Sequence, residues 1–391
     1  WSSLVIQKGL TMLQKFITIV GCVGVCLVGC LIPTALFADE PVASLVRPKM
    51  MEVFQRRGMD PKHAHPHAVG GAKRGAASVP VVVTLPEGEV FDNLQMKVAV
   101  LTHEEKTREV IPATTLPGIL EGRQLKAKLD VPAGGWYQLR VEVLAGEKVV
   151  AKAHVEKFGV GELFVVAGQS YACGHNDEVL KVQDEAKRVV AYDLVKDVWR
   201  VADDPQPNLA DGGTIWPPVG DHLSGVADVP VGFVNVAVGA TSSMQWQPGG
   251  KLFENLELAG KRLGDFRAVL WQQGESDVIA KSTLETYVTN LVNVRDTISQ
   301  SWGSKRPWIM AKSTLHPTVY NDPVHEGIIR EGIDLLVAKY GFVAGPDTDL
   351  LDKENRGPAN SRRHFSGIGQ KRAALMWFAS IWQAIQVEDR R

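Results

Sequence analysis

From residue 159 to the end of the chain, short apolar runs alternate with longer stretches in which apolar residues recur with helical spacing. The apolar runs predict buried strands at 163–167, 231–238, 266–271, 307–312 and 342–345. Helical spacing predicts helices over 282–301, 323–340 and 367–385. Because strands alternate with helices, we predict an α/β domain over 159–391, with a parallel sheet and helices on both of its faces.

Between about residue 77 and residue 158 the apolar period changes to two. Apolar and polar residues alternate over 125–131 and 137–143, and glycine-containing turns follow at 132–135 and 145–147. Short half-buried strands with regular turns predict a small β-sandwich domain over 77–158, in front of the α/β domain. No aromatic platform for sugars stands out in it, so we expect a scaffold role.

The first 38 residues have the layout of a secretory signal. Lys8 and Lys15 precede an apolar run over 16–32, and Ala38 provides the small residue at the cleavage point. This order predicts cleavage and a secreted or periplasmic location. A transmembrane anchor is one alternative, because the run approaches the roughly 20 residues that span a bilayer. Leu-Val-Gly-Cys ending at Cys30 resembles a bacterial lipobox, so lipid anchoring at the cell envelope is the other.

Residues 39–76 are predicted to form a linker. The segment lacks an apolar period, and its second half contains His63, His65 and His67 next to prolines. Solvated loop histidines are the preferred interpretation, and a metal site is the alternative.

Composition and motifs exclude several classes of function. With 45% hydrophobic residues, the chain has the composition of an ordinary globular protein. Its formal net charge of -1 gives no indication of binding to nucleic acid. A membrane is expected as a partner only through the N-terminal segment. No phosphate loop, zinc spacing or dinucleotide fingerprint occurs, so we expect no metal and no cofactor. Outside the N-terminal apolar run Cys173 is the single cysteine, and we expect it to be a buried packing group.

Gly168-Gln169-Ser170 carries the candidate chemistry, at the end of the strand predicted over 163–167. Glycine lets the backbone turn sharply there and leaves the serine hydroxyl open to a substrate. An acyl-transferring serine also needs a base, a carboxylate that orients the base, and donors for the oxyanion. Gln273-Gly274-Glu275 and His364 complete these parts in the chain order Ser, Glu, His. Because sites in parallel sheets form beyond the carboxyl ends of strands, we expect them to meet there.

Together these segments resemble the SGNH (GDSL-like) hydrolase superfamily. More narrowly, Gly168-Gln169-Ser170-Tyr171 and Trp271 to Asp277 are similar to the signatures of the sialate O-acetylesterase and family-six carbohydrate (acetylxylan) esterase branch. Val238 to Thr241, followed by Trp246, resembles the family's glycine block. The resemblance covers roughly residues 159–385. It implies a flavodoxin-like three-layer fold.

The resemblance also implies a role for each site residue. Ser170 attacks the ester carbonyl and His364 takes the serine proton. Glu275 orients His364, with Asp277 as the second candidate. The backbone N–H groups of Ser170 and Gly239 and the side-chain amide of Gln273 form the oxyanion hole.

Two positions depart from the family pattern. Ser361 stands where many relatives have an aspartate three residues before the histidine, and Tyr171 stands where an asparagine is usual. Tyr171, Trp246 and Trp271 are candidates for substrate binding. The two tryptophans, together with Trp216, are expected to form a wall on which sugars stack. The alternative for each tryptophan is burial in the core. His175 and Asn176 follow the serine, where substrate contact and ordinary capping are both open.

We therefore expect an exported serine carboxylic-ester hydrolase that removes O-acetyl groups from carbohydrates, with sialate or plant polysaccharide as the substrate. One alternative is a non-catalytic glycan-binding protein on the same scaffold, which the departures at positions 171 and 361 favour. The other is an enzyme of the same superfamily that acts on a lipid or a thioester.

Overall fold

The computed structural model of the protein describes residues 43–58, 75–87, 93–208, 210–317, 320–358 and 362–389. The expected signal segment, the histidines at 63, 65 and 67, and Ser361 lie outside these residues.

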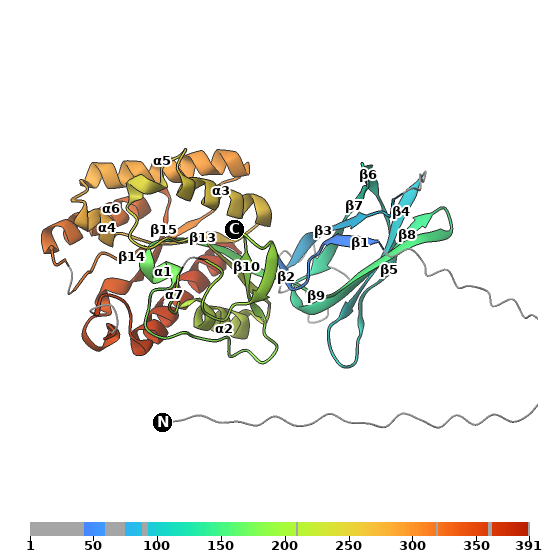
Figure 1. Ribbon diagram of the computed structural model, residues 1–391, viewed down its shortest axis with the longest axis horizontal. Coiled ribbons are helices and arrows are strands. Elements are labelled where there is room, and N and C mark those ends of the chain that lie inside the picture. The colour runs from blue at the N-terminus through green and yellow to red at the C-terminus, as the bar shows by residue number, and fades with distance from the viewer. Residues whose placement is uncertain are drawn as a thin grey trace, which may run out of the picture. The chain divides into compact units, whose positions relative to one another are not determined.

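The N-terminal strands form two sheets that pack face to face (Figure 1). One sheet has the order β1 (Ser44–Arg47), β3 (Ala76–Thr84), β7 (Gln124–Pro132) and β6 (Ile119–Glu121). The other contains β5 (Glu109–Pro117), β4 (Leu94–Thr102), β8 (Gly134–Ala145), the first half of β9 (Lys148–Gly168) and β2 (Glu52–Gln55). Alternate valines of β3 and β4 meet in the core between the sheets, as a period of two requires.

The linker prediction is wrong for residues 43–58. β1 pairs with β3 in antiparallel fashion, and β2 pairs in parallel with β9, with Glu52 opposite Phe158. Each of these strands has four residues, which is too short to show a period. Their partners lie about 40 and 100 residues away, so the sequence around them carries no local sign of pairing.

The central sheet has the order β11-β10-β12-β9-β13-β14-β15. After β9 its strands are β10 (Val189–Asp193), β11 (Val198–Val201), β12 (Val231–Asn235), β13 (Ala268–Gln272), β14 (Trp308–Lys312) and β15 (Val343–Asp347). All neighbours are parallel except β10 and β11, which form an antiparallel hairpin at one edge. Without that hairpin the order is second, first, third, fourth, fifth, which is the flavodoxin-like arrangement that was predicted.

Helices cover both faces of this sheet (Figure 1). One layer contains α2 (Trp216–Ala227) and α7 (Gly367–Glu388), and the other contains α3 (Lys251–Leu263), α5 (Leu284–Trp302) and α6 (Pro323–Tyr340). The short helices α1 (Ser170–Cys173) and α4 (Glu275–Ile279) directly follow β9 and β13. Within the described residues, turns of 3₁₀-helix lie in the connecting loops at η3 (Ser243–Trp246), η4 (Thr348–Leu350) and η5 (Lys353–Asn355).

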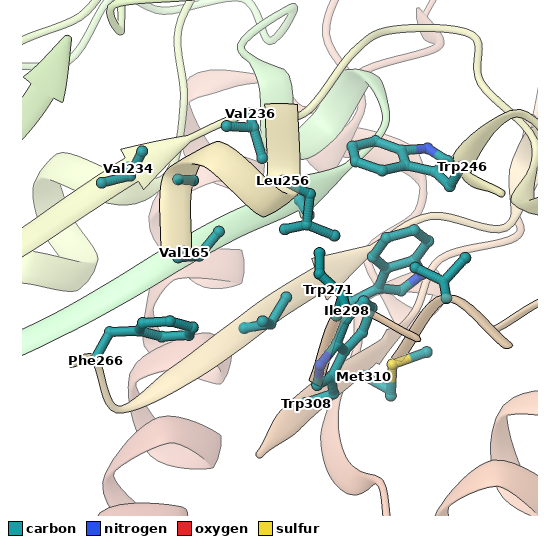
Figure 2. Packing of buried hydrophobic residues seen from close by; sticks show 14 of the residues in the cluster. Val165, Val234, Val236, Trp246, Leu256, Phe266, Trp271, Ile298, Trp308 and Met310 are labelled. Atoms are coloured by element: carbon teal, nitrogen blue, oxygen red, sulfur yellow. The ribbon is translucent and has the colours of Figure 1, made fainter. Parts of the chain in front are cut away.

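Strand β13 shows why both helical layers are needed. Val269 and Trp271 pack against the layer of α3, α5 and α6, whereas Ala268 and Leu270 pack against the layer of α2 and α7. Figure 2 shows the first of these clusters, in which Trp271 lies close to Trp308 and Met310. A strand that buries both faces reads as a continuous apolar run, which is the pattern that predicted it. None of the helices that the structure describes is long and apolar enough to cross a membrane.

Strand β9 connects the N-terminal sheets with the central sheet, and a buried ion cluster lies on this strand. The strand continues without a break through the domain boundary that was predicted at 158 and 159, and the described residues belong to one compact unit. Within it Glu162 is fully buried and accepts hydrogen bonds from Gln55, Arg56 and Arg267 at 2.7–2.9 Å. Burial raises the pKa of Glu162, but the guanidinium groups of Arg267 and Arg56 outweigh it and hold the pKa below its ordinary value.

Replacing Glu162 by glutamine should therefore cost about 3–5 kcal/mol of the free energy of unfolding, because two buried guanidinium groups lose their fully buried carboxylate partner and keep Glu388 and Asp389 as anionic neighbours. Urea denaturation at neutral pH measures this. The matched control is Glu142→Gln, whose partner Lys97 lies 3.3 Å away on the surface, and it should change stability by less than about 1 kcal/mol. Equal effects of the two substitutions would contradict the role of the cluster.

Candidate active site around Ser170

Ser170 lies at the carboxyl edge of the central sheet, immediately after a sharp turn. Gly168 has a φ of 125°, and a Cβ atom at this position would lie 2.1 Å from the carbonyl oxygen of Gln272. The N–H of Gln169 donates to the same oxygen at 2.9 Å. Only glycine allows strand β9 to turn this close to β13. The turn places Ser170 at the first position of α1, with 8% of its surface exposed.

Gly239 and His175 lie beside Ser170. A Cβ atom on Gly239 would be 3.8 Å from the Cβ of Ser170 and 3.0 Å from Nε2 of His175. The structure thus brings Gly239 to the serine, as predicted, and its role as an oxyanion donor stays a prediction. Cys173 is buried, and burial raises the pKa of its thiol to about 11, against a smaller lowering by the backbone N–H of Gly239. A protonated buried thiol fits the packing role that was expected of it.

His364 belongs to the same cluster of side chains. Its ring centre lies 5.3 Å from that of Tyr171 and 6.0 Å from that of His175. However, within the described residues both of its ring nitrogens are buried without a hydrogen-bond partner. Burial lowers the pKa of His364 to about 3, with further lowering by positive charge at His175, Arg363, His316 and Arg356. The imidazole is therefore neutral at physiological pH, and no carboxylate among the described residues holds it in one orientation.

Glu275 is not paired with His364. The carboxyl group is fully buried, Oε1 accepts a hydrogen bond from Ser313 Oγ at 2.6 Å, and Oε2 has no partner among the described residues. Burial raises the pKa of Glu275 to about 8. Asp277 accepts hydrogen bonds from Ser243, Gln273 and Ser282 instead. The prediction that Glu275 or Asp277 orients His364 is thus not met by the geometry.

The predicted role of Gln273 in the oxyanion hole is also wrong. Its side-chain N–H groups donate to the carbonyl oxygen of Thr241 at 3.1 Å and to Asp277 Oδ2 at 2.6 Å. Both donors are therefore used within the protein. Gln273 holds the loop after β12 against the loop after β13, and so it supports the loop that contains Gly239.

The aromatic residues predicted to contact substrate are core residues. Trp216, Trp246 and Trp271 are fully buried, and Figure 2 shows Trp246 and Trp271 inside the cluster of α3 and α5. Trp216 donates from Nε1 to the carbonyl oxygen of Ala172 at 2.8 Å, which satisfies its one polar group. These side chains are large and apolar, and they are buried in the core. The sequence alone does not distinguish a tryptophan buried in the core from one that stacks on a sugar.

Tyr171 is buried as well. Its hydroxyl group donates to the carbonyl oxygen of Arg363 and contacts Nη1 of Arg356. Burial, partly offset by Arg356, raises the pKa of this hydroxyl well above its ordinary value. Tyr171 therefore ties the segment before His364 to the helix that begins at Ser170.

Asn176 fastens the same segment from the other side. Its Nδ2 donates to the carbonyl oxygens of Tyr171 and Gly213, and its Oδ1 accepts from the N–H of Phe365 at 3.2 Å. Of the two open interpretations for Asn176, structural bonding is the correct one. A buried amide that bridges three segments has no local sequence signature.

Sequence reasoning missed two features of the site. His175 Nδ1 lies 3.0 Å from Oδ1 of Asp211, and the sequence around Asp211 gives no sign of this pairing. His316, in the loop after β14, is buried near His364, and burial together with Arg363 and Arg356 lowers its pKa to about 4. Among the described residues no group of three His, Cys, Asp or Glu side chains is placed to hold a metal ion.

The fold is that of an SGNH hydrolase. A solved structure of a carbohydrate acetylesterase from Xanthomonas citri superposes with a TM-score of 0.54, over 89% of this chain and 76% of that one, at 15% identity. Residues 160–335 match the family model described as carbohydrate esterase, sialic acid-specific acetylesterase. The match agrees with the resemblance seen in the motifs of this segment.

A relative from Arabidopsis thaliana, named as a probable carbohydrate esterase, is 38% identical over 65 residues. The match covers 16% of this chain and a quarter of the length of that protein.

The raised pKa of Glu275 gives a testable pH dependence. Between its ordinary value of 4.5 and about 8, the folded protein keeps a proton that the unfolded chain releases. The stability that the folded protein gains from this proton on Glu275 is therefore complete below pH 4.5 and is lost as the pH rises to about 8. Glu275→Gln should remove this loss, so urea unfolding at pH 5 and pH 8 should differ less in the variant, by at most about 1.4 kcal/mol per pH unit. Parallel stability curves for the two proteins would contradict the assignment.

Proposed function

We propose that the protein is an esterase that removes O-acetyl groups from carbohydrates through an acyl-enzyme intermediate on Ser170. The observation that carries the proposal is the position of Ser170, on a tight glycine turn at the carboxyl edge of the sheet, with Gly239 and imidazole side chains next to it. The family match over residues 160–335 supports the same chemistry.

In this mechanism the hydroxyl oxygen of Ser170 attacks the acetyl carbonyl carbon, and its proton passes to a neighbouring imidazole. The negative charge on the carbonyl oxygen is stabilised by backbone N–H groups. The N–H of Ser170 is suited to this role, because the first residues of a helix lack an acceptor within the helix. The N–H of Gly239 is the second candidate donor. When the electrons return to form the carbonyl group again, the bond to the sugar oxygen breaks, and that oxygen takes the proton from the imidazole as the sugar leaves. A water molecule then attacks the acetyl-serine, which releases acetate and restores the serine hydroxyl.

The substrate class follows from the names of the related proteins. The description of the family model favours O-acetylated sialic acid, and acetylated plant polysaccharide is the second candidate. Release of acetate from acetylated sialic acid and from acetylxylan, compared at equal ester concentration, distinguishes the two. We further propose that the N-terminal segment exports the protein, which places the enzyme outside the cytoplasm with access to such polymers.

The unpaired nitrogens of His364 favour a second candidate function, which is glycan binding without catalysis. The two functions differ in turnover. A binding protein would retain an acetylated sugar unchanged, whereas an esterase releases acetate from it.

Replacing Ser170 by alanine should lower hydrolysis of p-nitrophenyl acetate by at least about 10³-fold, because the residue that forms the covalent intermediate is lost. Circular dichroism should show an unchanged fold. The matched control is Ser304→Ala, in the turn after α5, which should keep the wild-type rate. Full activity of the Ser170 variant would rule out the acyl-serine mechanism.

A further inference from the structure

Tyr171 connects the serine of the site with its histidine. It directly follows Ser170 in α1, and its ring packs edge to face against His364, with 5.3 Å between the ring centres. The ring of Phe365, the residue after the histidine, lies 4.5 Å from it. Only 1% of the surface of Tyr171 is exposed, so its neighbours enclose the ring. A buried side chain on the helix that carries the serine therefore contacts the histidine directly.

The hydroxyl group of Tyr171 is held between a donor and an acceptor. It donates to the carbonyl oxygen of Arg363 at 2.5 Å and accepts from Nη1 of Arg356. Because a hydroxyl group has one proton to donate and lone pairs with which to accept, both bonds can form at once. The carbonyl group of Arg363 belongs to the peptide bond that leads into His364. The tyrosine thus acts on the histidine through its backbone as well as through its ring.

Arg356 is a buried cation that has no carboxylate partner among the described residues. Its guanidinium group bonds instead to the hydroxyl of Tyr171 and to carbonyl oxygens, with Nε donating to that of Leu351 at 2.5 Å. It lies 5.1 and 4.9 Å from the ring centres of Tyr171 and Phe365, which favours a cation on the ring faces. Burying a charge without a counter-charge costs free energy, so packing alone gives no reason for an arginine here.

The backbone on either side of His364 is fastened as well. The three successive carbonyl oxygens of residues 363–365 all accept hydrogen bonds. Their donors, in this order, are the hydroxyl of Tyr171, the N–H of Gly357 at 2.9 Å and the N–H of Asp177 at 3.0 Å. Of these three donors, the hydroxyl of Tyr171 is the one that a side-chain substitution can remove. The position of the histidine therefore depends on this hydroxyl group and on the arginine behind it.

We infer that Tyr171 and Arg356 are positioning residues that hold His364 at the site of Ser170; this inference rests on the proposed esterase function. Ser361 stands where many relatives have an aspartate, so the usual carboxylate is missing from this position of the sequence. The tyrosine and the arginine take over the placement of the ring. They do not make it more basic, because burial and nearby positive charge, that of Arg356 included, lower the pKa of His364.

The test measures the second-order rate constant with which a small alkyl fluorophosphonate modifies Ser170, followed by intact mass. This reaction needs an activated serine and no particular ester. Tyr171→Phe keeps the buried ring and removes both hydrogen bonds of the hydroxyl. It should lower the rate constant by about 10–10²-fold, because a small misplacement of the histidine is enough for such a loss. The matched control is Tyr137→Phe in the β-sandwich, whose buried hydroxyl donates to the carbonyl oxygen of Pro132 at 3.1 Å, and it should keep the wild-type rate.

Arg356→Lys is the second variant. Lysine keeps the positive charge, but it lacks the planar group that reaches the carbonyl oxygen of Leu351 and the hydroxyl of Tyr171 together, so a loss of similar size is expected. A positioning role also predicts non-additivity. At high phosphonate concentration, Tyr171→Phe should cause no further loss in a protein that already carries His364→Gln, because the hydroxyl acts only through the histidine.

A wild-type rate in Tyr171→Phe, Arg356→Lys or His364→Gln would overturn the inference. So would a full further loss when Tyr171→Phe is added to His364→Gln, because the hydroxyl would then have a structural role that does not pass through the histidine. A wild-type protein that does not react also overturns it. If the wild type reacts with the phosphonate but hydrolyses no acetyl ester, the proposed function fails while the positioning of His364 stands.

Discussion

The close approach of strands β9 and β13 at Gly168 is the constraint on which the site depends. Backbone meets backbone there, with no room for a side chain, and the chain must leave the sheet in a conformation that favours glycine. Ser170 is consequently delivered to one point at the edge of the sheet. The apolar strands behind it are buried on both faces, so the position of the serine is fixed by the core of the central sheet.

Around Ser170, polar side chains hold loops together through hydrogen bonds. Tyr171, Asn176 and Gln273 each use their hydrogen-bonding atoms to join segments that are distant in the sequence. The two histidines near the serine sit in contrasting surroundings. One faces a carboxylate, and the other lies in a buried, positively charged environment that keeps it neutral.

The fold could be predicted from the sequence because its strands and helices are long enough to show their periods. The strands at 163–167 and 307–312 and the helix over 323–340 were found in this way. The short strands of residues 44–55 were missed, since their pairing is decided by partners far along the chain. For the site, the motifs predicted that Ser170 and Gly239 lie together, and the structure places them side by side, while their catalytic roles stay predictions. They did not give the orientation of Glu275 or the role of Trp246, because a hydrogen bond and a buried face depend on neighbours that no local pattern records.

Ser170 should carry a covalent acetyl group during turnover, and mass spectrometry can detect it. The purified protein is mixed with p-nitrophenyl acetate, quenched in acid within the first turnovers, and digested for peptide mapping. The peptide that contains Ser170 should gain the mass of one acetyl group and lose it again as hydrolysis finishes. Turnover of the ester with no acetyl group on that peptide at any time, or with the group on another residue, would contradict it.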